Sequence, residues 1–274
     1  MIYCEGDTGS VVRLIQRAGG VVVDGVWGPK TTEAVKAWQQ AQGLAVDGLV
    51  GPASMAQLLK PEPEPIHGID VSHYQGKIDW AQVKRAGICF VYCKATQGNG
   101  SADPTFGPNV IGANSAGLLV GAYHFAVADH RAGDAVAEAR ACVARMDGYQ
   151  LQLPPALDLE TNSDKLTPAE LEQWALDWLA EMHRLTLRRS ILYSGSYFLR
   201  AQAGSGSRIA ATGCRYWVAR YRGSQATDPG LLAGFSDWTI WQNSGHGKVP
   251  GITGAVDLDV LHGGSDSLAA LVGD

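Results

Sequence analysis

The sequence predicts an α/β protein, in which an irregular (β/α) barrel follows a small domain of three helices. Three observations carry this prediction. After residue 67, eight short apolar segments alternate with helical or loop-rich segments, as in right-handed βαβ units. Before that point, a proline-rich stretch separates off an N-terminal region with a repeat of its own. The 34 glycines indicate many tight turns.

Composition and charge exclude several classes of protein. Of the 274 residues, 46% are hydrophobic and 18% are charged, which is typical of a globular chain with a core. A net charge of −5 argues against nucleic-acid binding, which needs a basic surface. No run of about 18 uncharged apolar residues occurs, and the N-terminus lacks the basic and apolar regions of a signal peptide. We therefore expect no membrane insertion and no secretory signal.

The cysteines indicate neither a disulfide framework nor a metal site. They are five, an odd number, and no Cys-x-x-Cys pair occurs. Cys89 and Cys93 would lie on one face of a strand with Cα atoms ~13 Å apart, too far for a bridge. We expect free, mostly buried thiols, no bound metal and no cofactor.

Residues 61–66 form the expected linker between two domains. Pro61, Pro63 and Pro65 alternate with glutamates. Prolines at this density prevent a helix and favour an extended chain. The prediction is a domain of residues 1–60, a Pro/Glu linker of residues 61–66 and a barrel of residues 67–274.

The N-terminal region contains an internal repeat. The segment VDGVWGP at residues 23–29 is echoed by VDGLVGP at residues 46–52, and each copy leads into a segment with helical apolar spacing. A third helical segment precedes both, with Ser10 as its N-cap and two glycines, Gly19 and Gly20, at its end. The pattern predicts three helices and two similar turns.

This region resembles the peptidoglycan-binding domain found at the ends of many cell-wall hydrolases. The resemblance rests on the D-G-x-[FW]-G turn at residues 24–28, on the T-x-x-A-V-x-x-[FW]-Q pattern at residues 31–39 and on a second D-G pair. It implies cell-wall binding, with Asp24, Trp27 and Asp47 as candidate contacts. The alternative for these residues is structural: the tryptophan would lie in the core and the aspartates would form the turns.

Beyond the linker, eight apolar segments are predicted to be strands. They are Gly68–Val71, Ile88–Ala95, Leu118–Phe125, Pro155–Glu160, Ser190–Tyr193, Tyr216–Tyr221, Trp238–Gln242 and Val256–Leu261. Pro168–Leu185, with Thr167 as N-cap, has the strongest helical pattern, and a second helix is expected over Gly133–Met146. The last connections, residues 222–237 and 243–255, are rich in Gly, Ser and Pro. We therefore expect a parallel, irregular TIM-like barrel with fewer than eight outer helices.

Acidic residues gather at the carboxyl ends of the predicted strands, where (β/α) barrels place their chemistry. Asp158 and Glu160 are two positions apart, so a strand would point both to one face with Cα atoms ~6.6 Å apart. Their repulsion in a cleft would raise one pKa and leave a proton donor beside an anion, which cleavage of a glycosidic bond requires. The alternative is that such carboxylates cap loops or pair with arginines such as Arg220.

The motifs of this region resemble those of glycoside hydrolase family 25, the Chalaropsis-type lysozymes. In the family's order they are GIDVSHYQG from residue 68, FVYCKATQG from residue 90, GAYHF from residue 121, PALDLE from residue 155, YWVARY from residue 216 and VDLDV from residue 256. The resemblance implies an irregular β/α barrel and a muramidase, which cuts the β-1,4 bond from N-acetylmuramic acid to N-acetylglucosamine.

The resemblance also implies roles for individual residues. Glu160 matches the acid/base, Asp158 the assisting carboxylate, and Asp70 and Asp257 two further acids of the site. The candidates for substrate binding are Tyr123, Tyr193, Trp217, Arg220, Tyr221, Trp241 and Gln242. Their aromatic rings, together with that of Tyr74, could form flat apolar walls for sugars. Two positions depart from the family pattern, Gln97 and Asp259, where the family often has glutamate and asparagine. His124 is expected to be structural or substrate-orienting rather than a base.

These observations together predict a modular peptidoglycan hydrolase, an endolysin whose partner is bacterial peptidoglycan. We expect a monomer that waits in the host cytoplasm, as a phage or prophage lysis protein, until it is released to the wall. Two mechanisms stay open: a substrate-assisted retaining route and an inverting route with Asp70 or Asp158 as base. Two other functions also stay open, a non-catalytic wall-binding protein and a peptidoglycan amidase, although no H-E-x-x-H motif occurs.

Overall fold

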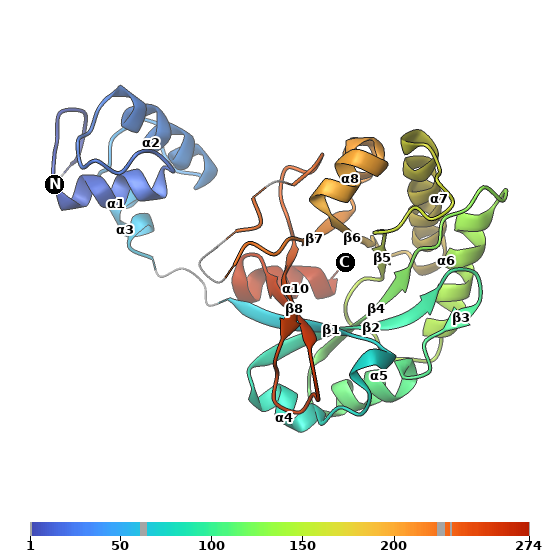
Figure 1. Cartoon of the computed structure of the whole chain (residues 1–274). Helices are drawn as coiled ribbons and strands as arrows, with labels where there is room; N and C mark the ends of the chain where they lie inside the picture. Colours follow the sequence, from blue (N-terminus) through green and yellow to red (C-terminus); the bar gives the residue numbers. More distant parts are fainter. Residues whose placement is uncertain (1, 61–64, 224–227, 231, 274) are drawn as a thin grey trace. The chain divides into compact units, whose positions relative to one another are not determined.

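The computed structural model describes residues 2–60, 65–223, 228–230 and 232–273. The chain forms two compact units, Met1–Glu62 and Pro63–Asp274 (Figure 1). Most of the predicted linker, residues 61–64, lies outside the described residues. The first strand of the second unit begins at Ile66, which the sequence analysis placed in the linker. No described helix is long and apolar enough to cross a membrane.

Three helices form the N-terminal unit, as predicted. They are α1 (Ser10–Ala18), α2 (Pro29–Ala41) and α3 (Pro52–Leu58). The second and third begin with a proline, whose missing N–H would have no partner in the first turn anyway. The helices meet around a small core of five buried side chains: Val12, Ile15, Trp27, Val35 and Val50.

A buried glutamine holds each of the two repeated turns. Gln16 Nε2 donates to Asp24 Oδ1 (2.7 Å), and Gln16 Oε1 accepts from the backbone N–H of Gly25 (2.8 Å). Gln39 makes the same two hydrogen bonds in the second copy, with Asp47 and the glycine that follows it, both at 2.8 Å. Both glycines have a left-handed backbone, with φ of 80° and 75°, which explains why each copy contains glycine there.

The three residues predicted to bind the cell wall are parts of this framework. Asp24 and Asp47 also accept from the backbone N–H two residues further on, at 2.9 Å in each copy. Trp27 is 1% exposed, and its Nε1 donates to Thr32 Oγ1 (2.9 Å). A buried ring offers no face to a sugar, and each aspartate uses Oδ1 to hold its turn. The structural alternative for these residues therefore fits the structure, because a unit this small needs them for its core and turns.

Eight strands of the second unit close into a barrel in the order β1-β2-β4-β5-β6-β7-β8-β9, and β9 pairs with β1. They are β1 (Ile66–Val71), β2 (Ile88–Gln97), β4 (Leu119–Phe125), β5 (Ala156–Asp158), β6 (Ile191–Gly195), β7 (Arg215–Ala219), β8 (Ile240–Gly247) and β9 (Val256–Leu261). The short β3 (Ser101–Ala102), which pairs with β2, was not predicted. Each predicted segment overlaps one of the eight strands, and the predicted barrel is confirmed.

The last strand departs from the predicted parallel arrangement. The strands from β1 to β8 that form the barrel pair in parallel, whereas β9 is antiparallel to both of its neighbours. A parallel connection needs a crossover of about a dozen residues or more, but only residues 248–255 separate β8 from β9. The chain therefore turns back as a hairpin.

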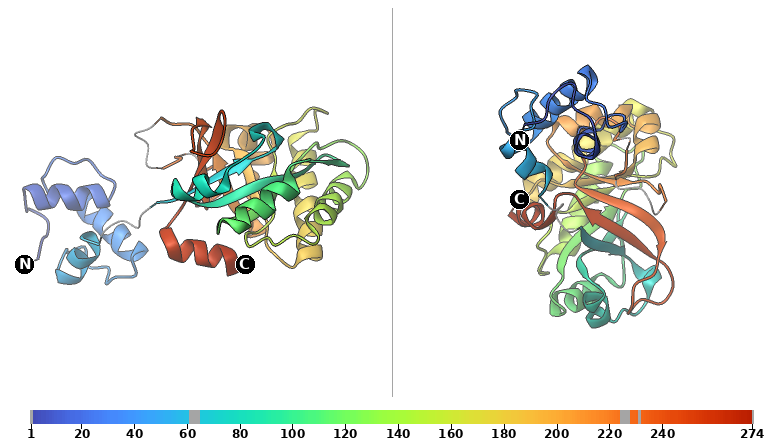
Figure 2. Two further views of the ribbon diagram at one scale, coloured as in Figure 1. Left: turned by 90° about the horizontal axis from the view of Figure 1, so that it is seen from below. Right: turned by 90° about the vertical axis from the view of Figure 1, so that its left-hand side faces the viewer.

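Helices cover the outside of the barrel incompletely (Figure 2). They are α4 (Trp80–Arg85), α5 (Phe106–Ser115), α6 (Asp134–Met146), α7 (Pro168–Thr186), α8 (Ser196–Gln202), α9 (Ser207–Ala211) and α10 (Gly264–Gly273), with the 3₁₀ turns η1 (His73–Gln75) and η2 (Gly204–Gly206). The predicted α7 has its predicted cap, in which Thr167 and Glu170 bond reciprocally. The described residues between β7 and β8 form no helix, which agrees with the predicted irregularity.

Successive strand residues point alternately into the barrel and towards the helices. Most inward side chains are apolar and form one buried cluster, which includes Phe90, Tyr92, Ile191, Trp217, Ile240 and Leu261. The C-terminal helix α10 joins this cluster through Leu271. Outward side chains, such as Val91 and Val218, pack with the helices in a second cluster.

All five cysteines are free thiols. Cys93 and Cys142 are fully buried in the outer cluster, between the barrel and its helices. Burial raises the pKa of Cys142 to about 12 and raises that of Cys93 as well, because a thiolate is poorly solvated there. Both groups therefore stay protonated and unreactive near neutral pH.

The barrel interior leaves no room for a side chain at Gly68. A Cβ atom there would lie 2.2 Å from the buried ring of Phe90 on the neighbouring strand. We expect Gly68→Ala to destabilise the barrel by about 1–3 kcal/mol, which urea unfolding monitored by tryptophan fluorescence would measure. The control is Gly195→Ala, where the closest atom would be 3.9 Å away and the expected change is below about 0.5 kcal/mol. Equal effects of the two substitutions would contradict this packing argument.

Candidate active site

A cavity of about 270 Å³ opens at the carboxyl ends of the barrel strands. Nine of the predicted site residues line it, namely Asp70, Tyr123, Asp158, Glu160, Tyr193, Trp217, Tyr221, Gln242 and Asp257. They come from β1, β4, β5, β6, β7, β8 and β9 or from the residues directly after these strands. The closed barrel thus brings side chains from most of its strands to one opening.

Strand alternation explains why the acids meet. Asp70 on β1 and Asp158 on β5 continue the inward positions of their strands. β5 ends at Asp158, but the backbone N–H of Leu159 still donates to the carbonyl oxygen of Tyr193 (3.0 Å), so the chain stays extended for one more step. The side chain of Glu160 therefore points to the same side of the chain as that of Asp158, and both line the same cavity.

Asp70 accepts a hydrogen bond from Gln242, whose amide group is oriented by two tyrosine hydroxyls. Gln242 Nε2 donates to Asp70 Oδ2 (2.8 Å). Gln242 Oε1 accepts from the hydroxyls of Tyr193 (2.9 Å) and Tyr221 (2.8 Å), which orients the amide so that its N–H group faces the carboxyl. Burial raises the pKa of Asp70, and the two carboxyls of β9 raise it further.

Asp158 and Glu160 differ in their access to solvent. Asp158 is 6% exposed, and its Oδ1 has no hydrogen-bond partner among the described residues, whereas Glu160 is exposed. Burial raises the pKa of both groups. Repulsion adds to this rise, from Glu160 for Asp158 and from Asp257 for Glu160, while the ammonium of Lys94 opposes it. Burial and repulsion thus both disfavour two negative charges on this pair.

Two further acids, both on β9, belong to the same cluster of carboxyl groups. Burial raises the pKa of Asp257, and a hydrogen bond with Asp70 opposes the rise. Asp259 is 1% exposed and accepts from Trp217 Nε1 (2.9 Å), while its Oδ2 has no partner among the described residues. Burial raises the pKa of Asp259 well above the usual carboxyl range. One donor does not compensate a buried carboxylate, so the protonated form is favoured.

Tyr74, expected among the aromatic residues that face a sugar, also lines the cavity. The sequence analysis did not identify five further lining residues: Val71, Ser72, Gln75, Lys94 and Phe125. Lys94 is 8% exposed, its Nζ donates to Gln97 Oε1 (2.7 Å), and it lies 4.5 Å from the centre of the Phe125 ring. Burial lowers the pKa of Lys94, and nearby acids, Asp158 first, counteract this. A lysine inside the otherwise apolar segment ICFVYCKAT was the signal that could have identified it.

Two predicted substrate-binding residues do not line this cavity. Trp241 is 4% exposed, packs in the outer cluster and donates from Nε1 to the carbonyl oxygen of Arg220 (2.7 Å). The guanidinium of Arg220 donates to the carbonyl oxygen of Pro229 (2.8 Å) and lies 5.5 Å from the centre of the Tyr197 ring. Each of the two directly precedes an inward-facing residue, and neighbours in an extended chain point to opposite faces.

His124 also faces the helices. It is fully buried, with Nδ1 2.8 Å from Thr96 Oγ1 and Nε2 2.7 Å from Glu138 Oε2 on α6. Its ring stacks on that of Trp178 in α7, with 5.6 Å between ring centres. These contacts agree with the predicted structural role. Among the described residues, no group of three or more His, Cys, Asp or Glu side chains is arranged to hold a metal ion.

Comparison with known families decides the classification of the barrel. Residues 69–252 match the model of the glycosyl hydrolases of family 25. The chain belongs to this family. Residues 7–58 match the model of a peptidoglycan binding domain, so the family 25 barrel follows a second recognised module.

Several members of family 25 are similar to this chain over most of its barrel. Lysozyme M1 of Streptomyces globisporus is 36% identical over 214 residues, which are 75% of this chain and 71% of that protein. The N,O-diacetylmuramidase of Chalaropsis sp is 30% identical over 190 residues, 65% of this chain and 88% of that protein. The crystal structure of a lysozyme from Streptomyces coelicolor has 33% identity and a TM-score of 0.65, covering 76% of this chain and 96% of that one.

Asp259→Asn tests the energetic consequence of the buried carboxyls. The unfolded chain releases this proton near the usual carboxyl pKa, whereas the folded chain holds it to a higher pH, so the free energy of unfolding falls as pH rises between these two values. Asparagine keeps the acceptor for Trp217 and cannot ionise. We expect the stability of the variant relative to the wild type to increase as pH rises above about 4, where the unfolded wild-type chain releases its proton.

Urea unfolding of both proteins at several pH values measures this difference. Subtracting the wild-type curve removes the pH dependence that the two proteins share. A stability difference that stays constant with pH would contradict the assignment of a protonated Asp259.

Proposed function

We propose that this chain is a peptidoglycan hydrolase, an N-acetylmuramidase that cleaves the β-1,4 bond between N-acetylmuramic acid and N-acetylglucosamine. The observation that carries the proposal is the pair of Asp158 and Glu160, which share one cavity at the carboxyl end of a family 25 barrel. The names of the similar proteins, lysozyme and N,O-diacetylmuramidase, and the match to a peptidoglycan binding model support this substrate.

Glu160 is the general acid and then the general base in this proposal. Its exposed side chain can reach the leaving oxygen and exchange its proton with water, whereas Asp158 is buried. A raised pKa keeps Glu160 protonated closer to neutral pH, so that it can protonate the leaving oxygen. The resulting carboxylate then takes a proton from the attacking water.

Asp158 assists through the substrate's own 2-acetamido group. Its buried Oδ1 is an acceptor without a donor, and the acetamido N–H group of the muramic acid would supply one. The acetamido oxygen, held in this way, attacks the anomeric carbon while Glu160 protonates the leaving oxygen. Water then opens the intermediate, and the product keeps the β configuration. In the alternative inverting route, Asp70 or Asp158 activates water directly.

The remaining residues of the cavity bind and orient the sugar. Asp70 and Asp257 place polar groups opposite the reacting pair, and Gln242 holds Asp70. Tyr123 and Tyr221 provide aromatic surface beside them, whereas Tyr193 and Trp217, 8% and 2% exposed, form the floor of the cavity. We assign no direct substrate contact to Arg220 and Trp241, because neither lines the cavity.

In this proposal, the N-terminal module gives the enzyme a second binding site for peptidoglycan. We propose that residues 1–60 bind peptidoglycan and that the linker, residues 61–66, keeps the barrel of residues 67–274 at high effective concentration near the glycan. We propose further that the protein acts as a monomer, does not bind nucleic acid, and waits in the host cytoplasm as an endolysin until it is released to the wall.

Glu160→Gln tests the acid. The amide keeps the shape of the side chain but cannot transfer the proton, so we expect lysis of purified cell walls to fall by about 10²- to 10⁴-fold. The control is Asp177→Asn on the exposed side of α7, which should keep wild-type activity. Turbidity of a wall suspension measures both, and unfolding curves check that both variants are folded. Wild-type lysis by Glu160→Gln would instead favour a non-catalytic or different role.

The products identify the bond and the mechanism. Mass spectrometry of digested walls should show new reducing ends on muramic acid and none on glucosamine. Free amino groups from an amide cleavage would point to the amidase. NMR of the first product should show the β anomer; an initial α anomer would exclude the substrate-assisted route.

A further inference from the structure

An exposed tyrosine stands at the edge of the cavity on a short turn. Tyr74 lies in η1, directly after β1, and lines the cavity together with Asp70 and Gln75. Its side chain is among the most exposed of the aromatic residues, at 81%, and no hydrogen bond of its hydroxyl is found among the described residues. Neither burial nor a hydrogen bond of the hydroxyl explains the position of this ring, so its contacts within the chain do not account for its presence.

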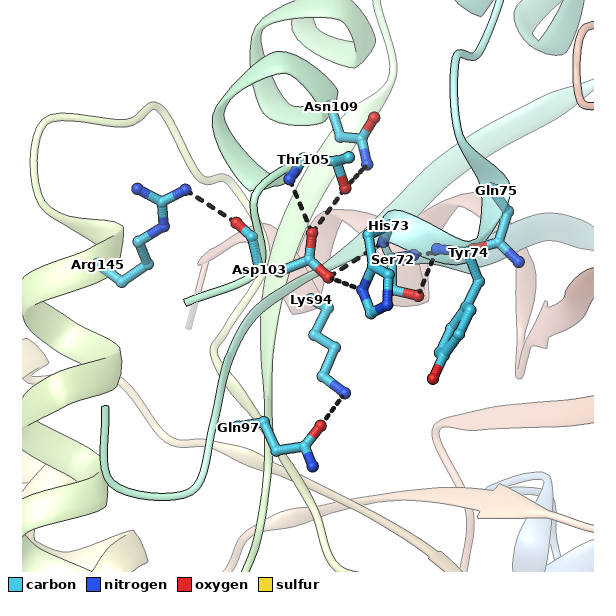
Figure 3. A network of polar contacts seen from close by, with 10 residues as sticks. All are labelled: Ser72, His73, Tyr74, Gln75, Lys94, Gln97, Asp103, Thr105, Asn109 and Arg145. Carbon is cyan, nitrogen blue, oxygen red and sulfur yellow. Dashed lines mark hydrogen bonds and ion pairs between the residues drawn. The ribbon is translucent and has the colours of Figure 1, made fainter. Parts of the chain in front are cut away.

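A buried carboxylate holds this turn from one side (Figure 3). Asp103 Oδ2 accepts from the backbone N–H of His73 (3.0 Å) and lies 2.8 Å from His73 Nδ1. Asp103 Oδ1 accepts from the backbone N–H (2.9 Å) and the hydroxyl (2.6 Å) of Thr105. Arg145 on α6 donates to the carbonyl oxygen of Asp103 (3.0 Å). These contacts fix the carboxylate and lower the pKa of Asp103.

The turn is also held from within and from the opposite side. Gln75 Oε1 accepts from the backbone N–H of Ser72 (2.9 Å), and Ser72 Oγ accepts from that of Tyr74 (3.4 Å). Gln75 Nε2 donates to the carbonyl oxygen of Ala255 in the β8–β9 hairpin (3.2 Å). The His73 ring lies against the Tyr74 ring, with 4.2 Å between centres and 35° between planes. The backbone that carries Tyr74 is therefore fixed, and its ring contacts His73 while the residue stays 81% exposed.

We propose that Tyr74 is the stacking platform of an outer saccharide subsite, which binds an N-acetylhexosamine ring of the glycan beyond the pair that is cleaved. The inference rests on the proposed muramidase function and adds a chain-length preference to it. Pyranose rings present apolar C–H faces that pack on aromatic rings, and a ring held before binding loses little conformational entropy on binding. Since β1 and β5 are three strands apart around the barrel, the platform lies across the opening from Glu160.

Kinetics on two lengths of substrate test the subsite. The substrates are the disaccharide of N-acetylmuramic acid β-1,4-linked to N-acetylglucosamine, which fills only the two positions of the cleaved pair, and an alternating octasaccharide, both given to the full chain. We expect Tyr74→Ala to raise KM for the octasaccharide by about three- to tenfold with kcat unchanged, and to leave the disaccharide almost unaffected. Tyr74→Phe keeps the ring and should behave as wild type. The matched control is Tyr197→Ala, an exposed tyrosine that does not line the cavity.

Asp103→Asn tests the support of the platform. The amide group has one acceptor oxygen in place of two, so it cannot accept from His73 and from Thr105 at the same time. The turn therefore loosens, and the same length-dependent rise in KM is expected. If this variant does not fold, Tyr74→Ala alone decides. Equal effects of Tyr74→Ala on both substrates, no effect on either, or the same effect from Tyr197→Ala would overturn the proposal. Failure of the wild type to cleave either oligosaccharide would refute the proposed function instead, so the two failures are distinguishable.

Discussion

The concentration of buried acid in one opening is the constraint on which the rest of the barrel depends. Asp70, Asp158 and Asp259 are each less than a tenth exposed. Asp70 and Asp158 line the cavity, and among the described residues Lys94 is the cation that lines it with them. Such carboxyls oppose folding when they ionise, so apolar packing elsewhere must offset them. The filled barrel interior and the helical layer supply that packing. The free energy of apolar packing elsewhere in the fold therefore keeps these acidic side chains buried in the site.

Much of this arrangement could be predicted because it depends on local rules. Strand alternation alone places Asp158 and Glu160 on one side, and the structure brings them into one cavity even though the strand ends between them. The same rule, applied consistently, would have separated Gln242 from Trp241 and Tyr221 from Arg220. The sequence motifs obscured this, since each motif contains residues from both faces of its strand.

Other features depend on contacts that no local pattern contains. The direction of β9 follows from the length of its connection to β8, and the orientation of Gln242 follows from two hydroxyls on other strands. In the N-terminal unit, the D-G pairs suggested a binding motif, yet each aspartate bonds a glutamine eight residues earlier. A motif therefore identifies a turn more safely than it identifies a ligand contact.

The two buried thiols of the barrel, Cys93 and Cys142, bear on the redox conditions in which the fold is kept. No covalent cross-link contributes to the described fold, and Cys93 and Cys142 are shielded from oxidants by packing and by their high pKa. A barrel built in this way needs neither a reducing nor an oxidising environment to reach or keep its shape. The packing around these two thiols is therefore the same in reducing and in oxidising surroundings.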